Sequence, residues 1–397
     1  MKILITSPRA PVALEWANFA LAGGHQVLFC DGLQFPISIF AKIPNKHKKI
    51  SYHKIPSPRL DFAGYQRQMM VLIDAVDILV PTCEDIFYLA KLPLSPYQQQ
   101  KCFMPNKALL LGLHDKFGFF DLMPKDSAIQ FPETRYINDK EKIILDNTEQ
   151  KSILKPVYSR FGRSVVRGVS IEKIQSLDIS AKKAWVQQQF ITGDGLCNYA
   201  ICEHGKILAH AIYRPRYLLN DAASTYFEPV QDARLDDFVA KFAQLHQFHG
   251  QVAFDFIDDG QQLWLLECNP RATSGLHLLR HQLAFDGQGQ LQSKKQQQEN
   301  PNVENPNVEN PSLEKNHDSK PMRVGASLPA LFGIQAIKNG TWQQLWQDYQ
   351  RAEDVIADLP IYAQWLSLGE MFYRRVRYKH PLTNASTFDI EYDGDDN

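Results

Sequence analysis

The first part of the chain alternates between short apolar runs and one stretch with helical spacing of its apolar residues. Residues 2–6 (KILIT) are rich in β-branched residues and predict a strand. Residues 12–21 repeat apolar positions at helical intervals, and the glycines at 23 and 24 end the predicted helix. Residues 26–30 (QVLFC) predict a second strand. Strand, helix and strand within about 30 residues are typical of a βαβ unit and a parallel sheet, which residues 77–81 would extend.

The middle of the chain has a different pattern, in which strands outnumber helices. A helix is predicted around 235–246, and the acidic turn at 258–260 predicts a hairpin between the two strands that flank it. The predicted strands of this part are 152–156, 185–191, 199–202, 207–213, 251–257 and 262–268. The pattern therefore indicates an α/β fold at the start of the chain and an α+β fold in the middle.

The last third of the chain contains a polar segment followed by aromatic residues at helical spacing. Residues 287–320 hold a glutamine and lysine cluster and a repeated Asn-Pro-Asn-Val-Glu, so we expect a disordered insertion or a long surface loop with almost nothing buried. Residues 342–373 predict helices, and the acidic end from 392 onward is expected to fray.

Composition and charge narrow the class of protein. Of 397 residues, 44% are apolar and 22% charged, which excludes wholesale disorder, and the net charge of −1 gives no global attraction to nucleic acid or to a membrane surface. The six cysteines form no CxxC pair, which argues against a disulfide scaffold or a thiolate zinc site and suits a reducing compartment. No apolar run reaches ten residues, and prolines interrupt the start of the chain, so we expect a cytoplasmic protein without a signal peptide.

The first turn of the βαβ unit lacks the glycine that a dinucleotide pyrophosphate would require. This turn reads Ser-Pro-Arg-Ala-Pro, without a position where the backbone could approach the phosphates closely. The sequence therefore does not favour binding of NAD by this unit.

The strongest chemical signal lies at the predicted hairpin of 251–268. Asp255 and Glu267 can face each other across an antiparallel pair, and Asn269 adds an amide oxygen. Two carboxylates and one amide form an all-oxygen set that suits Mg²⁺, with Mn²⁺ as an alternative ion. Acids beside a turn are also common without any function. Arg271 follows Pro270 and could direct a forked cation to a carboxylate or phosphate in the same site.

Two further segments carry weaker signals for phosphate and nucleotide binding. Lys155 lies between apolar strand residues and a proline, where its ammonium needs an anion unless it extends to solvent. The following loop, with Ser159, Gly162 and Ser164, could cover phosphates, although it is not a Walker motif. Residues 187–195 leave a strand through a Gly-Asp-Gly turn whose backbone could bind an adenine edge, and Asp194 could accept from ribose hydroxyls.

Together these residues resemble the ATP-grasp superfamily over roughly residues 1–285. Within it, the opening Pro-Arg-Ala-Pro-Val-Ala-Leu-Glu is most similar to stand-alone proteins resembling the carbamoyl-phosphate synthase large chain, a group of carboxylate–amine ligases. The resemblance implies a Rossmann-like βαβ domain before two lobes that hold ATP. It also implies phosphate contacts for Lys116 and Lys155, a magnesium site at Asp255, Glu267 and Asn269, and an adenine-binding hinge formed by Gln188, Gln189, Phe190 and Ile191.

The sequence departs from the family pattern at the hinge. Many members have a glutamate where this chain has Gln188 or Gln189, so the contact to the adenine amine would use a side-chain carbonyl. The acid that binds ribose often stands where this chain has Gly195, and Asp194 is one position earlier. The residue that contacts ribose therefore stays open.

The resemblance implies an ATP-dependent ligase that activates a carboxylate as an acyl phosphate and joins it to an amine. Arg271, together with Arg214 or Arg216, is expected to hold the acyl phosphate, although these two arginines could equally form a solvated pair. A carboxylate–thiol ligase or small-molecule kinase of the same fold, or a non-catalytic nucleotide-binding module, is the alternative. We expect small-molecule partners and no nucleic acid or membrane, and leave open whether the chain forms a homodimer.

The same resemblance suggests how the chain divides. We expect an N-terminal α/β domain over residues 1–114 and a two-lobed ATP-grasp domain over 115–286. The polar insertion follows over 287–320, and a C-terminal helical region occupies 321–397.

Overall fold

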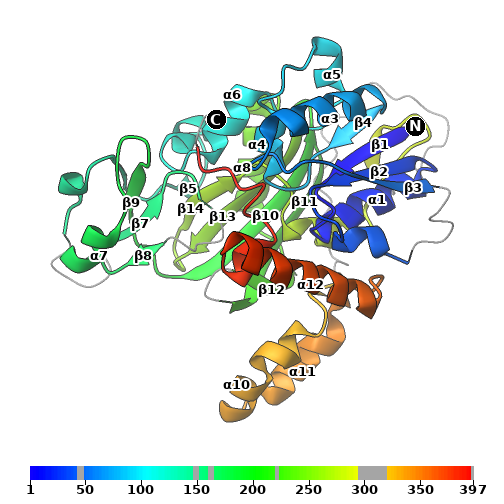
Figure 1. The fold of residues 1–397 in the computed structure, drawn as a ribbon. Coiled ribbons are helices and arrows are strands. Elements are labelled where there is room, and N and C mark those ends of the chain that lie inside the picture. The colour runs from blue at the N-terminus through cyan, green and yellow to red at the C-terminus, as the bar shows by residue number, and fades with distance from the viewer. Residues whose placement is uncertain (43–48, 146–151, 160–164, 220–222, 294–319, 395–397) are drawn as a thin grey trace.

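The computed structural model describes residues 1–42, 49–145, 152–159, 165–219, 223–293 and 320–394. These residues form three larger sheets, one two-stranded hairpin and several helices, of which a set lies at the C-terminal end (Figure 1). The predicted Gly162 and Ser164, and residues 294–319 of the predicted insertion, lie outside the described residues.

The N-terminal sheet confirms the predicted βαβ start. Its four parallel strands are ordered β3-β2-β1-β4, and their bounds are β1 (Lys2–Thr6), β2 (Gln26–Asp31), β3 (Ile50–Lys54) and β4 (Ile78–Val80). Helices α1 (Val12–Ala22) and α3 (Phe62–Asp74) cover opposite faces. Alternation along β1 explains this, because Ile3 and Ile5 pack with α1 residues while Leu4 packs with α3 residues.

The central sheet is antiparallel over most of its width and lies next to α1. Its strand order is β18-β17-β12-β11-β10-β13-β14-β5, and its main strands are β10 (Asp194–Glu203), β11 (Lys206–Leu219), β12 (Ala223–Val230), β13 (Gly250–Asp258) and β14 (Leu263–Asn269). Its short edge strands are β5 (Ile129–Gln130), β17 (Met322–Arg323) and β18 (Glu353–Asp354). Helix α8 (Ala233–His246) packs phenylalanines on one face of this sheet, and α1 packs Trp16 on the other.

A smaller antiparallel sheet stands apart from the central one in Figure 1. Its order is β6-β9-β7-β8, with bounds β6 (Thr134–Ile137), β7 (Ser152–Pro156), β8 (Val166–Arg167) and β9 (Trp185–Gln189). A cluster around Leu154 and Trp185 joins it to α7 (Ile171–Ser176). The remaining helices before the central sheet are α4 (Asp85–Leu89), α5 (Pro96–Gln100) and α6 (Lys107–His114).

The C-terminal part contains the predicted helices, and it also joins the rest of the fold. The helices are α10 (Gly333–Lys338), α11 (Trp342–Arg351), α12 (Ile361–Tyr378) and α13 (Leu382–Ala385). Strand β17, which precedes these helices, pairs with β12, and β18, which lies between α11 and α12, pairs with β17, so this part extends the central sheet. Figure 1 shows α10 and α11 projecting away from the body. No helix in the described ranges is long and apolar enough to cross a membrane.

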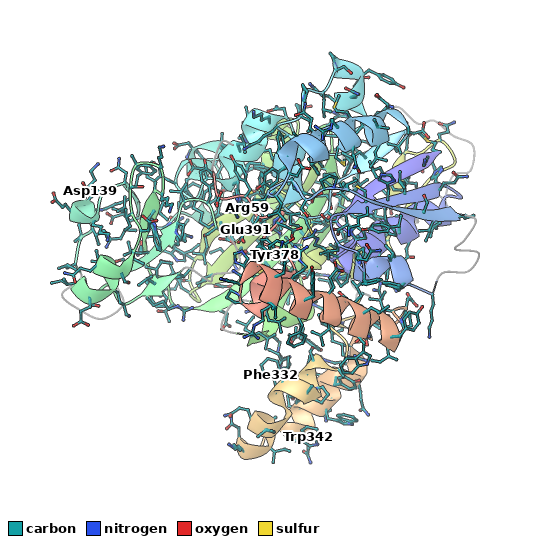
Figure 2. All side chains as sticks on the ribbon, viewed as in Figure 1. Arg59, Asp139, Phe332, Trp342, Tyr378 and Glu391 are labelled. Atoms are coloured by element: carbon teal, nitrogen blue, oxygen red, sulfur yellow. The ribbon has the colours of Figure 1, made fainter. Side chains whose placement is uncertain are left out.

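Two sequence expectations for this part are wrong in detail. The hairpin of β15 (Leu283–Phe285) and β16 (Leu291–Ser293) buries Leu291, so the segment without buried residues cannot begin at 287. The chain end does not fray as far back as 392, because Tyr392 is buried against Phe87 and His114. Arg59 also hydrogen-bonds the carbonyl of Glu391, and the two residues lie close together in Figure 2.

Candidate active site

A cavity of about 910 Å³ lies where the small sheet, the central sheet and the N-terminal domain meet. Its lining includes the turns after β1 and β4, the strands β7 and β9, and the carboxyl end of β14. Val324, Met371 and Thr387 of the C-terminal part also line it. The volume lies within the range of ligand-binding pockets, and most such pockets occur between domains in this way.

The three predicted metal ligands come together on one wall of this cavity. The register of β13 and β14 places Asp255 opposite Glu267, as the hairpin pattern predicted. The Asn269 amide nitrogen lies 3.2 Å from Asp255 Oδ2 and 3.3 Å from Glu267 Oε1. The Arg271 guanidinium donates to Asn269 Oδ1 at 3.1 Å, so the arginine belongs to the same cluster. These contacts give a compact group of hard oxygen donors.

Two buried lysines face this oxygen cluster from other elements. Lys155 on β7 is buried, and its ammonium donates to the carbonyl of Leu266 on β14 at 3.2 Å, which connects the small sheet to the central one. Lys116 follows α6, and its Nζ lies 3.7 Å from Glu267 Oε2 and donates to the carbonyl of Ser159. Ser159 thus lies beside the site through its backbone.

Burial and neighbouring charges shift the pKa values in this cluster. Burial raises the pKa of Asp255 to about 7, and the carboxylate of Glu267 adds to the shift. Burial opposes the ionisation of Glu267, but the ammonium groups of Lys116 and Lys155 hold its pKa below the ordinary value. Burial also lowers the pKa of Lys155 to about 8. The shifts of Asp255 and Lys155 show that burial disfavours the charged forms of both groups, and clusters of such perturbed groups in a cavity are typical of functional sites.

The end of β9 supplies a polar edge to the cavity. All four predicted hinge residues, Gln188, Gln189, Phe190 and Ile191, line it. Gln188 is fully buried, and its amide nitrogen donates to Thr134 Oγ1 at 3.1 Å, which leaves its Oε1 without a hydrogen-bond partner in the described residues. Gln189 instead accepts from the backbone N–H of Glu133. A buried amide oxygen that lacks a donor fits a ligand amino group.

The turn after the hinge requires its first glycine. A Cβ at Gly193 would lie 2.2 Å from the carbonyl oxygen of Asp258, so only glycine lets the backbone pass this close to β13. Asp194 starts β10, where it is exposed and forms an ion pair with Arg214 at 3.2 Å. Asp194 is not among the residues that line the cavity.

Arg214 and Arg216 also lie away from the cavity. Alternation along β11 explains this, because Tyr213 and Pro215 line the cavity, whereas the alternate positions 214 and 216 face the other side of the sheet. Arg216 forms ion pairs with Glu228 at 2.8 Å and Asp348 at 3.0 Å. The structure therefore does not bring these two arginines to Arg271.

The cavity includes charged residues that the sequence patterns did not single out as site residues. Arg9, from the Pro-Arg-Ala-Pro turn after β1, is buried and lines it. Glu84, after β4, is also buried there, with Oε1 3.5 Å from Arg271 Nη2. Both follow the carboxyl ends of parallel strands, the edge at which open α/β sheets bind ligands, and this position was the available signal.

Comparisons with solved structures identify chains of the same fold. N5-carboxyaminoimidazole synthetase from Staphylococcus aureus aligns with a TM-score of 0.52 and 13% identity, over 72% of this chain and 74% of that one. Its complex with ADP gives 0.51 and 12% identity over the same shares. The synthase from Aspergillus clavatus, in complex with ADP and 5-aminoimidazole ribonucleotide, gives 0.51 and 13%, again over 72% and 74%. No protein-family model and no curated protein sequence matches the chain.

At identities of 12–13%, the similarity shows a shared fold only. It covers 72% of this chain, and it confirms the mixed α/β and α+β fold class expected from the sequence.

Proposed function

We propose that this chain, which has the ATP-grasp fold, is an ATP-dependent ligase that joins a carboxylate to an amine. The observation that carries the proposal is the meeting of Asp255, Glu267 and Asn269 on one cavity wall with two buried lysines, of which Lys155 lines the cavity and Lys116 lies 3.7 Å from Glu267. Hard oxygen ligands and ammonium groups are what a metal-bound triphosphate requires. The solved ADP complexes of chains with this fold support a nucleotide here.

The donor set suits Mg²⁺ bound partly by the protein. Among the described residues no group of three or more histidine, cysteine, aspartate or glutamate side chains could hold a metal. Two carboxylates and an amide would therefore leave positions for phosphate oxygens and water, as Mg²⁺ prefers and Mn²⁺ accepts. The ion would neutralise charge on the transferring phosphoryl group.

The chain's own residues would position and stabilise the reactants. Gln188 Oε1 would accept from the adenine amino group, and Lys116 and Lys155 would hold the phosphates. A carboxylate oxygen of the substrate would attack the γ-phosphorus, and the bond to the β-phosphate oxygen would break to release ADP. The amine would then attack the acyl carbon, lose a proton and expel phosphate. Arg271, which donates to Asn269 in the same cluster, would be the cation that binds the acyl phosphate.

The second substrate would occupy the part of the cavity lined by the N-terminal turns. Arg9 and Glu84 lie there as a buried cation and a buried anion. The Arg9 guanidinium is already bound by Asp31 and Asp389, so Glu84 is the charged group there that could bind a substrate ammonium, and the proposal covers small amines that such an anion suits.

Product analysis tests the proposed reaction. The purified protein, ATP and Mg²⁺ are incubated with pools of carboxylates, and hydroxylamine replaces the amine. We expect ADP and a hydroxamate in the pool that contains the substrate, and little ADP without it, because the closed site excludes water. AMP and pyrophosphate would overturn the acyl-phosphate mechanism, and ADP without hydroxamate would favour a kinase. Failure of the protein to bind ADP with Mg²⁺ would exclude the ligase, the kinase and the nucleotide-binding module alike.

A further inference from the structure

Helix α12 presents its apolar side to solvent. Its inward side includes Ala363, Ser367, Glu370, Met371 and Arg374, of which Glu370 accepts from the backbone N–H groups of Gln34 and Phe35. Besides Tyr378 at its last position, its large exposed apolar side chains are Ile361, Tyr362, Trp365, Leu366, Phe372, Tyr373 and Val376. We call these seven residues the α12 stripe. An ordinary surface helix has the opposite polarity, so this stripe needs a partner.

The stripe forms one continuous band along the helix. At 100° per residue its seven positions, together with Gly369, fall within about 140° of the helix circumference. Trp365 is 66% exposed and Val376 is 78% exposed, so the inward contacts of α12 leave the band uncovered. With the full areas of such side chains, the exposed fractions amount to roughly 900 Å², above the largest apolar patch of most monomers.

Six of the seven stripe residues lie at matched distances on the two sides of Gly369, and only Ile361 has no apolar counterpart. Counting outward from this glycine in both directions pairs Leu366 with Phe372, Trp365 with Tyr373, and Tyr362 with Val376. A Cβ at Gly369 would meet nothing within 4 Å, so the centre of the band is open. Two antiparallel helices crossing at this point would approach closely at the glycines and pack large side chains against each other on both sides.

We propose that α12 forms a twofold-symmetric interface with α12 of a second copy of this chain. A twofold contact uses the same surface on both partners, and a crossing at Gly369 would bring large side chains of the stripe on one copy against large side chains of the stripe on the other. The exposed area of the stripe on one copy matches the about 800 Å² per partner of a standard stable interface.

The charge distribution along α12 and the composition of residues 294–319 favour a second copy of this chain as the partner. The basic residues Arg375, Arg377 and Lys379 all lie at one end of α12, so antiparallel pairing places the two basic ends far apart. Residues 294–319 contain only three large apolar side chains, at 303, 308 and 313, too few to cover the stripe from within the chain.

Light scattering after gel filtration tests the interface through its central aromatic residue. We expect the full-length chain to run at twice its 45.4 kDa at tens of micromolar, and Trp365→Glu to weaken the dimer by at least about 30-fold, about 2 kcal/mol. The matched control is Val71→Arg on α3, where a valine is 68% exposed on the N-terminal domain. This control should remain dimeric, and unchanged melting temperatures should show that both variants fold.

A cross-link tests the symmetry directly. The two copies of Gly369 meet at the proposed axis, so Gly369→Cys should give a covalent dimer under mild oxidation that thiol reductant reverses. Val71→Cys is the control and should give none. A monomeric wild-type chain, a dimer that survives Trp365→Glu, or failure of the introduced thiol at 369 to cross-link would overturn the proposal. Binding of the monomer to lipid vesicles through the stripe would overturn it in favour of a membrane surface.

Discussion

Arg9 and Asp389 form a buried ion pair across 380 residues of chain, with 2.7 Å between Nη1 and Oδ1. Asp389 also accepts from Ser57 Oγ and pairs with Arg374, while Arg9 pairs with Asp31 on β2. Residues 386 and 387, just before this aspartate, line the cavity. The C-terminal segment 386–392 is therefore fixed to the N-terminal domain and forms part of the wall of the candidate site.

Loss of the Asp389 charge should destabilise the fold. In Asp389→Asn the Arg9 and Arg374 cations lose a buried counter-charge, which should lower the free energy of unfolding by about 3 kcal/mol. Urea unfolding followed by fluorescence measures this. The control is Asp393→Asn, which removes an exposed pair with Arg59 and should cost less than about 1 kcal/mol. Equal losses in the two variants would show that the buried pair has no special role.

The same carboxylate should make stability sensitive to acid. Burial alone would raise the pKa of Asp389, but Arg9 and Arg374 hold it well below its ordinary value. The folded state then binds fewer protons than the unfolded state, so this stabilisation is complete above about pH 4 and declines as pH falls further. Unfolding free energies between pH 6 and pH 3 should therefore decline less steeply in Asp389→Asn than in the wild type. Parallel curves would contradict this assignment.

Replacing Glu267 with glutamine should abolish turnover while the protein still folds. The side chain keeps its volume and loses one anionic ligand beside Asp255 and Asn269, so ADP formation should fall at least about 100-fold. The matched control is Asp259→Asn, in the exposed turn of the same hairpin, which should keep near-normal rates. Turnover by Glu267→Gln close to the wild-type rate would remove this residue from the proposed metal site.

Gln188 should determine the preference for adenine. Gln188→Leu removes the buried Oε1, and the Kd for ADP should rise about threefold to tenfold because one hydrogen bond is lost. Calorimetric titration with ADP and with inosine diphosphate, which lacks the amino group, separates this contact from general binding. The wild type should prefer ADP and the variant should bind both alike, whereas Gln189→Leu should keep the wild-type preference. A variant that still discriminates would place the adenine contact elsewhere.

Local sequence patterns were sufficient to predict those parts of the structure that depend on contacts between residues close in sequence. The βαβ start and the antiparallel pairing of Asp255 with Glu267 follow from short-range periodicity and one tight turn. The positions of the site lysines in the fold could not be derived in this way. Lys155 meets the carbonyl of Leu266 over 111 residues, and only the resemblance to a known family pointed to this pairing of segments.

The remaining errors have specific physical causes. Period-two alternation places Arg214 and Arg216 on one face of β11, but the sequence does not show which face borders the cavity. The chain end around Tyr392 is acidic and polar, which is typical of a frayed terminus, yet a single aromatic ring packed against Phe87 and His114 is enough to bury it. Such a docking contact depends on a surface made by distant residues.

The position of Asp389 in the sequence also determines when its ion pair with Arg9 can form during synthesis of the chain. A ribosome adding about 5–20 residues per second needs roughly 20–80 s to pass from Arg9 to its partner. Late in this interval the βαβ unit, the candidate hinge and the acidic hairpin have all been translated, while the wall containing residues 386 and 387 does not yet exist. A nascent chain or a truncated product that lacks residues 386–389 therefore carries the cluster of Asp255 and Glu267 in a cavity without this wall. Translation of residues 386–389, rather than folding of the central sheet, is the event that completes the lining of the cavity.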